Sequence, residues 1–159
     1  MSAKTIPVQP FDLVVFGATG DLAKRKIFPS LFKRFIAGQM PSEARIIGAA
    51  RSDVDQAGFV DLIRNAFHEF ASVGKKQEEE LERFLSLLNY VPIDVFSDAG
   101  WAELRDLFRE DVIALFISRS RRRCLVILRQ SLANMALKPM NHGLSLKNRL
   151  VKTRLVRGN

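Results

Sequence analysis

FDLVVFGATGDLAKRK, residues 11–26, contains an apolar run, a glycine-rich turn and a basic stretch, in that order. The apolar run at 12–16 predicts a buried parallel strand. Residues 17–20 form the turn, and a helix is expected to begin at Asp21. A strand that opens into a helix in this way directs free backbone N–H groups and the helix dipole at a phosphate. The stretch therefore predicts a dinucleotide-binding unit.

Apolar patterns further along the chain predict three more strands, separated by helices. The strands are expected at residues 45–50, 90–93 and 112–116. The first helix is expected to run from residue 21 to a stop at Gly38, with Pro29 as a kink or a new first turn. The second is expected to begin at a cap, Asp53 or Asp55, and to end at residue 70. Two more helices are expected over 77–88 and 101–108. Residues 124–128 could add a strand and 131–137 a short helix. The fold class is α/β, an incomplete Rossmann-like parallel sheet with helices on both faces.

The composition fits one soluble domain and excludes several classes of protein. The chain has 159 residues, of which 47% are hydrophobic. No apolar stretch approaches the roughly 20 residues that cross a bilayer, and no apolar leader precedes Pro10. The single Cys124 excludes an internal disulfide and a cysteine-rich zinc site. We therefore expect a cytoplasmic protein with no metal centre and no membrane partner.

The charge divides the chain into two unlike parts. Residues 1–114 contain 14 Lys or Arg and 17 Asp or Glu, whereas residues 115–159 contain 11 Lys or Arg and no acidic residue. Folded cytosolic surfaces normally mix both signs. The division predicts a partial dinucleotide-binding domain over 1–114 and, over 115–159, a poorly defined basic tail that is not a true domain.

The glycines of the first turn have separate roles. Gly17 permits the tight turn, and Gly20 lets the backbone approach a pyrophosphate. Their spacing is Gly-x-x-Gly-x-x-Ala, with Thr19 where the usual G-x-G-x-x-G pattern has its middle glycine. A pattern this short also fits a structural strand-to-helix turn that binds nothing.

The residue after the second strand indicates which coenzyme is bound. NAD-binding folds usually place an acidic residue there for the ribose 2′-hydroxyl, but this chain has Arg51 and no acid before Asp53. A guanidinium fork suits a 2′-phosphate, so NADP is favoured over NAD. The alternative is a solvated surface arginine.

Each of the other candidate residues also fits a role that involves no ligand. The run Lys24-Arg25-Lys26 fits a solvated helix face, although at least one of its side chains should reach an anionic ligand. Asp94-Val95 follows the third strand, where such folds contact adenosine, and Asp94 equally fits a turn or helix cap. Neither His68 nor His142 has neighbours that indicate a catalytic base.

With these residues in view, the chain resembles the glucose-6-phosphate dehydrogenase family. The resemblance covers about residues 10–114 and rests on GATGDLAKRK, the following PSL, IIGAAR at 46–51, and Tyr90 with Asp94-Val95. It implies that Arg51 binds the 2′-phosphate of NADP, that Asp94 and Val95 line the adenosine side, and that Lys26 reaches the sugar phosphate. It also implies that the pyrophosphate is wrapped by Gly17, Ala18, Thr19, Gly20, Asp21, Leu22, Ala23 and Lys24.

Several parts of the family pattern are missing from this chain. The family carries Phe-Tyr-Leu-Ala-x-x-Pro, then Glu-Lys-Pro-x-Gly, and later Arg-Ile-Asp-His-Tyr-Leu-Gly-Lys-Glu, which supplies the histidine base and its Asp partner. Its large second domain holds most of the sugar-phosphate site and the dimer interface. None of these occurs here. We therefore expect no catalytic residue in this chain, no dehydrogenase activity and no native dimer.

A shifted reading frame would explain the basic tail. Residues 145–153 can be encoded as TCA TTG AAA AAC CGG TTG GTA AAG ACT, which reads Ile-Glu-Lys-Pro-Val-Gly-Lys-Asp once two bases are dropped. With the same shift, suitable synonymous codons for residues 115–129 read Phe-Tyr-Leu-Ala-Val-Ala-Pro-Ser-Leu-Phe-Gly-Asp-Ile-Ala. One constant shift thus restores two missing motifs in their family order. The hypothesis is a single-base insertion or deletion near residues 112–115.

Two competing functions have weaker support in the sequence. An extended short-chain dehydrogenase also can begin Gly-Ala-Thr-Gly, but it needs a Tyr-x-x-x-Lys pair, and Tyr90, the only tyrosine, is followed four residues on by Asp94. The basic tail would bind nucleic acid or anionic membranes through charge alone. Phe116 is its only aromatic residue, so no specific nucleic-acid partner is expected.

Overall fold

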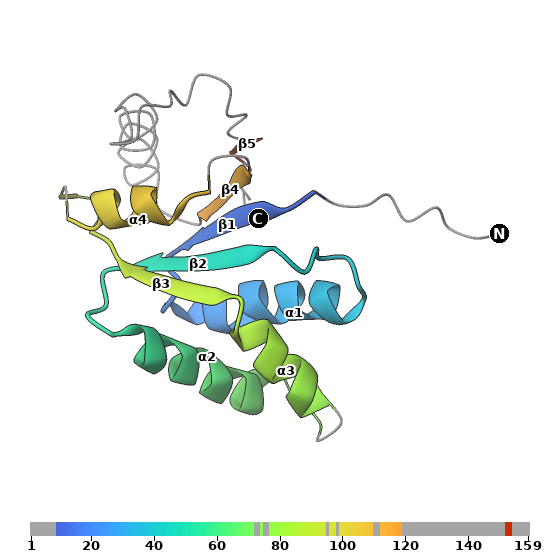
Figure 1. The fold of residues 1–159 in the computed structure, drawn as a ribbon. Helices are drawn as coiled ribbons and strands as arrows, with labels where there is room; N and C mark the ends of the chain where they lie inside the picture. Colours follow the sequence, from blue (N-terminus) through green and yellow to red (C-terminus); the bar gives the residue numbers. More distant parts are fainter. Residues whose placement is uncertain are drawn as a thin grey trace.

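The computed structural model describes residues 9–71, 74, 77–94, 96–97, 99–109, 112–118 and 152–153. Its sheet has the strand order β3-β2-β1-β4-β5, and every neighbouring pair is parallel (Figure 1). The strands are β1 (Phe11–Phe16), β2 (Arg45–Ala50), β3 (Leu88–Pro92), β4 (Ile113–Ser118) and β5 (Lys152–Thr153). The helices are the π-helix η1 (Ala23–Ile27), α1 (Phe28–Ile36), α2 (Gln56–Phe70), α3 (Glu78–Leu85) and α4 (Trp101–Leu107). The α/β class and the parallel sheet are confirmed.

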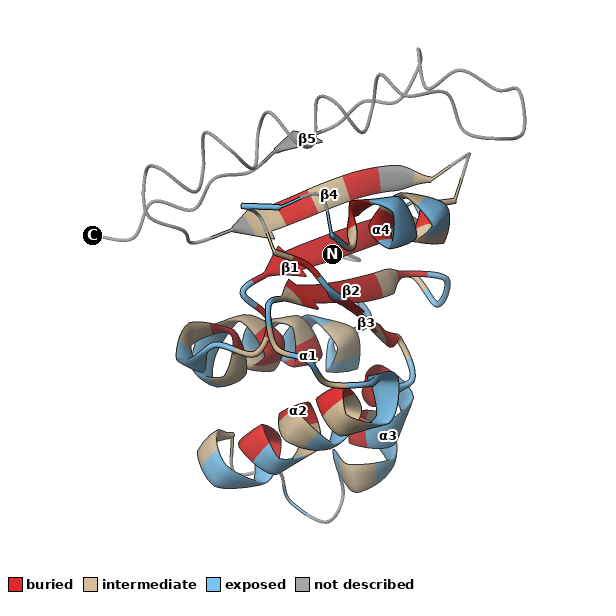
Figure 2. Cartoon of the chain, turned by 90° about the vertical axis from the view of Figure 1, so that its left-hand side faces the viewer, coloured by how far each residue is buried: buried red, intermediate tan, exposed pale blue. Residues whose placement is uncertain are grey.

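Helices cover both faces of the sheet, as the sequence predicts. Successive residues of β1 point to opposite faces, so Leu13 and Val15 pack with α1, α2 and α3. Val14 and Phe16 pack on the other face, where Trp101 and the rest of α4 cover them. Figure 2 shows buried residues along the strands and exposed residues on the outer sides of the helices. The order in which β1 lies between β2 and β4 places the topological switch point beside the turn that follows β1.

The helix expected from residue 21 is divided in two at Pro29. Residues 21–22 are helical, η1 adds a π-helical turn, and α1 follows with Pro29 in its first turn. The preceding turn is π-helical, and the Phe28 N–H donates to the Ala23 carbonyl, so the helix is locally wider just before the proline that lacks an N–H. The expected stop at Gly38 is confirmed: its φ is 67°, and the Gln39 N–H donates to the Arg34 carbonyl at 2.9 Å.

Some boundaries differ from the prediction. Asp55, rather than Asp53, caps α2 by accepting the Gly58 N–H at 2.7 Å. The helix expected over 77–88 ends at residue 85, and Leu88 begins β3, so the strand expected at 90–93 spans 88–92. Both apolar patterns put Leu88 in the same core, which is why periodicity alone did not separate them. β4 runs over 113–118 instead of 112–116. The strand considered at 124–128 and the helix considered at 131–137 lie outside the described residues.

A buried ion pair between Asp12 and Arg109 lies at the amino-terminal end of the sheet. Asp12 in β1 is fully buried, and its carboxylate accepts hydrogen bonds from Nε (3.1 Å), Nη2 (2.7 Å) and the backbone N–H (3.1 Å) of Arg109. The same guanidinium donates to the Glu43 carbonyl at 2.7 Å. Arg109 therefore joins the segment before β4 to β1 and to the loop before β2.

Replacing Arg109 by alanine is expected to destabilise the chain by about 3 kcal/mol, because the Asp12 carboxylate stays buried without its counter-charge. The free energy of unfolding in urea measures the effect. Arg83→Ala, which removes an exposed arginine from α3, is the matched control and should change stability by less than about 0.5 kcal/mol. Equal losses in the two variants would contradict the prediction.

Candidate dinucleotide site

The turn after β1 forms a tight loop against β2. Gly17 has a φ of 74°, which side-chain-bearing residues rarely adopt. The N–H groups of Gly17 and Ala18 donate to the Ala49 carbonyl at 2.7 and 3.3 Å, and the Gly20 N–H donates to the Gly17 carbonyl at 2.9 Å. A Cβ on Gly20 would lie 3.1 Å from that carbonyl oxygen. Gly17 thus has the turn conformation that the sequence predicts, whereas the approach of Gly20 to a pyrophosphate stays a prediction.

The turn leaves backbone donors available for an anion. Among the described residues, the N–H groups of Thr19, Asp21 and Leu22 have no hydrogen-bond acceptor. They lie where β1 ends and the first helix begins, so the helix dipole adds to their positive potential. This donor set fits the pyrophosphate of a dinucleotide. The fit rests on the chain's own backbone and needs no charged side chain.

The turn can lie this close to the sheet because Gly48 in β2 has no side chain. A Cβ there would lie 2.5 Å from Cζ of Phe59 and 3.0 Å from Cβ of Ala18. Phe59 comes from α2 and stacks on Tyr90 of β3, with ring centroids 4.6 Å apart. Gly48 therefore admits the turn and α2 to the same patch of the sheet.

The segment that follows β2 makes hydrogen bonds on two sides, to the turn after β1 and to Tyr90 of β3. The Ser52 hydroxyl lies 2.8 Å from the Thr19 hydroxyl, which joins this segment to the phosphate turn. The Tyr90 hydroxyl donates to the Ser52 carbonyl at 2.6 Å. Arg51, between β2 and Ser52, is exposed. Its position beside the turn is the one that the sequence predicts for a residue that binds a ribose 2′-phosphate.

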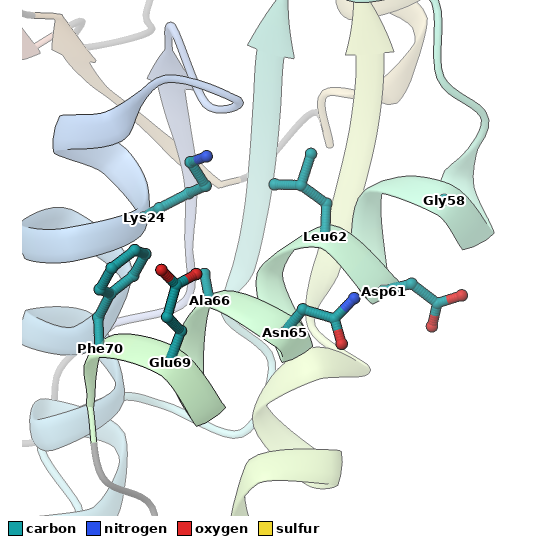
Figure 3. Close-up of a pocket in the computed structure, with 8 residues that line it drawn as sticks. All are labelled: Lys24, Gly58, Asp61, Leu62, Asn65, Ala66, Glu69 and Phe70. Carbon is teal, nitrogen blue, oxygen red and sulfur yellow. The ribbon is translucent and has the colours of Figure 1, made fainter.

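The three residues of the basic run, Lys24, Arg25 and Lys26, lie in three different environments. Arg25 pairs with Asp21 at 2.6 Å and lies 4.2 Å over the ring of Phe70, so both charged groups have partners within the chain. Lys26 is exposed. Lys24 lies on the wall of an open pocket between η1 and α2, whose volume is about 420 Å³ (Figure 3). The other residues that line this pocket are Gly58, Asp61, Leu62, Asn65, Ala66, Glu69 and Phe70.

The remaining candidates bond to residues outside the turn or lie outside the described residues. Asp94 accepts the Phe96 N–H at 3.0 Å through its side chain, the turn role that the sequence left open. Val95 and His142 lie outside the described residues. His68 is on α2, about half exposed, with Nδ1 3.8 Å from Oε1 of Glu78. Within the described ranges no cluster of acidic, His or Cys side chains could hold a metal ion, and no helix is long and apolar enough to cross a membrane.

Comparison with known proteins decides the family. The model of the family described as "Glucose-6-phosphate dehydrogenase, NAD binding domain" matches residues 14–156. The chain belongs to the glucose-6-phosphate dehydrogenase family. It is 44% identical over 110 residues to a glucose-6-phosphate 1-dehydrogenase of Rhizobium meliloti and 43% identical over 101 residues to that of Gluconobacter oxydans. These alignments cover 69% and 63% of this chain but only 22% and 21% of the relatives. The chain thus spans about a fifth of their length.

The fold is that of the glucose-6-phosphate dehydrogenases as well. A crystal structure of glucose-6-phosphate 1-dehydrogenase from Mycobacterium avium superposes on 92% of this chain with a TM-score of 0.75 at 22% identity. A structure described as glucose-6-phosphate dehydrogenase in complex with glucose-6-phosphate covers 94% of it with a TM-score of 0.71. The matched family model is described as an NAD binding domain, so the family resemblance is confirmed. The order of strand, turn and helix predicted for residues 11–26 is confirmed by β1 and η1, whereas coenzyme binding by this turn stays a prediction.

Sequence reasoning missed the residues that support the site. Ser52 and the Tyr90 hydroxyl had no pattern to mark them, because their partners are backbone or lie more than 30 positions away. Gly48 sits inside an apolar strand, where an isolated glycine is itself a signal of close backbone approach. That signal was available in the sequence and points to the packing of Ala18 and Phe59.

Proposed function

We propose that this chain is the NADP-binding part of a cytoplasmic glucose-6-phosphate dehydrogenase and that it does not catalyse the reaction by itself. The family reaction oxidises glucose 6-phosphate to the phosphogluconolactone while hydride passes to NADP, in the pentose phosphate pathway. The observation that carries the proposal is the exposed Arg51 directly after β2, held beside the donor-rich turn by Ser52 and Thr19.

The proposed roles follow the chain from the turn outward. Within residues 17–24, the backbone N–H groups of Thr19, Asp21 and Leu22 bind the pyrophosphate, and Arg51 binds the 2′-phosphate through its guanidinium fork. Asp94 and Val95 line the adenosine side, and Lys26 reaches toward the sugar phosphate. The coenzyme supplies the hydride acceptor, whereas these residues bind and orient it.

Arg51 should determine the preference for NADP over NAD. We expect the wild-type chain to bind NADP more tightly than NAD. The Arg51→Ala variant should bind NADP roughly ten- to a hundredfold more weakly, because charged hydrogen bonds to the 2′-phosphate are lost. Its affinity for NAD should change little. Isothermal titration calorimetry with both coenzymes measures this. Arg34→Ala, which removes an exposed arginine from the far end of α1, is the control for net charge. A loss shared by both variants would leave Arg51 without a special role.

The purified 159-residue chain should not reduce NADP with glucose 6-phosphate. His68 lies near Glu78 on the exposed side of α2, away from the turn, and the 159 residues span only about a fifth of the length of their relatives. Absorbance at the NADPH band measures turnover, with a full-length family member as the positive control. Turnover comparable to that control would refute the proposed inactivity.

The division at residue 114 is part of the same proposal: residues 115–159 are translated out of frame. The two restored motifs support the shift, as does the absence of acidic residues. The family match through residue 156 weighs against it. Of this segment the structure describes residues 115–118 and β5, which pairs with β4 in parallel register.

Sequencing the gene should decide the frame. We expect the codons of residues 115–153 to read Phe-Tyr-Leu-Ala and then Glu-Lys-Pro-x-Gly once two bases are skipped, with an open frame continuing into the second domain. The reference is the gene of a full-length relative such as that of Rhizobium meliloti. Codons in the skipped frame that contain stops or lack both motifs would refute the shift.

A further inference from the structure

The phenol of Tyr90 lies at the centre of the hydrogen bonds behind Arg51. Its hydroxyl donates to the Ser52 carbonyl at 2.6 Å and lies 3.2 Å from the Ala50 carbonyl. These carbonyls belong to the residues on either side of Arg51. The Ala50 carbonyl also accepts the Ile93 N–H at 2.8 Å, whereas Tyr90 is the one described donor to the Ser52 carbonyl. The hydroxyl therefore holds the far side of the Arg51 segment.

The ring that carries this hydroxyl is itself fixed. It stacks on Phe59 at a centroid distance of 4.6 Å and an interplanar angle of 24°. The backbone N–H of Tyr90 donates to Oε1 of Gln56 at 2.8 Å, and Nε2 of Gln56 donates to the Leu88 carbonyl at 2.8 Å. Burial raises the pKa of the Tyr90 phenol, and nearby Asp53 adds to this effect, so the hydroxyl remains protonated and able to donate at neutral pH.

We propose that Tyr90 is a positioning residue that fixes the Arg51–Ser52 segment for the 2′-phosphate of the coenzyme. Ser52 is held between two elements, by Tyr90 at its carbonyl and by Thr19 at its hydroxyl. Arg51 therefore begins from a fixed backbone, and its long side chain loses less freedom when it meets an anion than it would from a mobile loop. The inference rests on the proposed NADP site and adds that β3, which β2 separates from β1 in the sheet, sets the strength of 2′-phosphate recognition.

The experiment compares two small probes that differ by one phosphate. The ratio of the dissociation constants of 5′-AMP and 2′,5′-ADP isolates the contribution of the 2′-phosphate, and calorimetry on the full chain measures both. Tyr90→Phe keeps the stacked ring and removes the hydroxyl. We expect it to lower the ratio by roughly three- to tenfold, with the affinity for 5′-AMP nearly unchanged. A purely structural role would weaken both probes equally.

Trp101→Phe is the matched control. It deletes another buried aromatic donor, the indole N–H that bonds the Ser97 carbonyl at 3.0 Å, on the opposite face of the sheet. It should leave the ratio unchanged. If Tyr90→Phe fails to fold, Ser52→Ala tests the same segment by removing the bond to Thr19 without disturbing a buried ring, and it should lower the ratio too.

The outcomes separate this inference from the proposed function. Wild-type chain that binds neither probe would overturn both. Wild-type chain that prefers 2′,5′-ADP, with the ratio unchanged in Tyr90→Phe, would overturn the role of Tyr90 alone. A lowered ratio in Tyr90→Phe and an unchanged ratio in Trp101→Phe would support it.

Discussion

The candidate dinucleotide site depends on the absence of a side chain at Gly48. Real Cβ atoms essentially never approach within 3.0 Å of another atom, yet a Cβ here would lie 2.5 Å from Phe59. Only glycine lets the turn that contains Ala18 and the helix that contains Phe59 share one patch of β2. Phe59 then supports Tyr90, and Tyr90 supports the segment after β2. Thus a packing constraint inside the sheet is transmitted, through one aromatic stack, to the segment that we propose binds the coenzyme.

The two ends of the sheet differ in how their polar groups are bonded. At the amino-terminal end, Asp12 and Arg109 place a charged pair in the interior, with the carboxylate bonded by both the guanidinium and a backbone N–H. Such a pair adds little net stability compared with apolar packing, but removing one partner is costly, so it favours one arrangement of the chain. At the carboxyl-terminal end, the N–H groups of Thr19 and Asp21 have no acceptor among the residues that the structure describes. The amino-terminal end therefore pairs its buried charge within the chain, whereas the carboxyl-terminal end presents backbone donors that a ligand can bind.

Local patterns predicted most of the fold, because they are carried by neighbours in sequence. The apolar runs located the first four strands, Gly38 and Asp55 marked helix ends, and the glycine turn located the crevice. Boundaries moved where one residue suited two elements, as Leu88 does. The bonds of Ser52 and the pair of Asp12 with Arg109 join residues 33 to 97 positions apart, so no local pattern carries them. The position of the described part of the candidate site was thus predictable from the sequence, whereas the contacts that support it were not.

The formation of β4 does not discriminate between the two reading frames. Ala114 and Phe116 face one core, and Leu115 and Ile117 pack against the other. With suitable synonymous codons, the proposed shift changes Leu-Phe-Ile to Phe-Tyr-Leu, which is still a largely apolar run. β4, which lies between β1 and β5 in the parallel sheet, accepts either run. Charge behaves differently, because the restored frame introduces Asp and Glu into a segment that now has none. Under the proposed shift, the distribution of carboxylates, and not the apolar pattern, is therefore the feature that distinguishes the two frames.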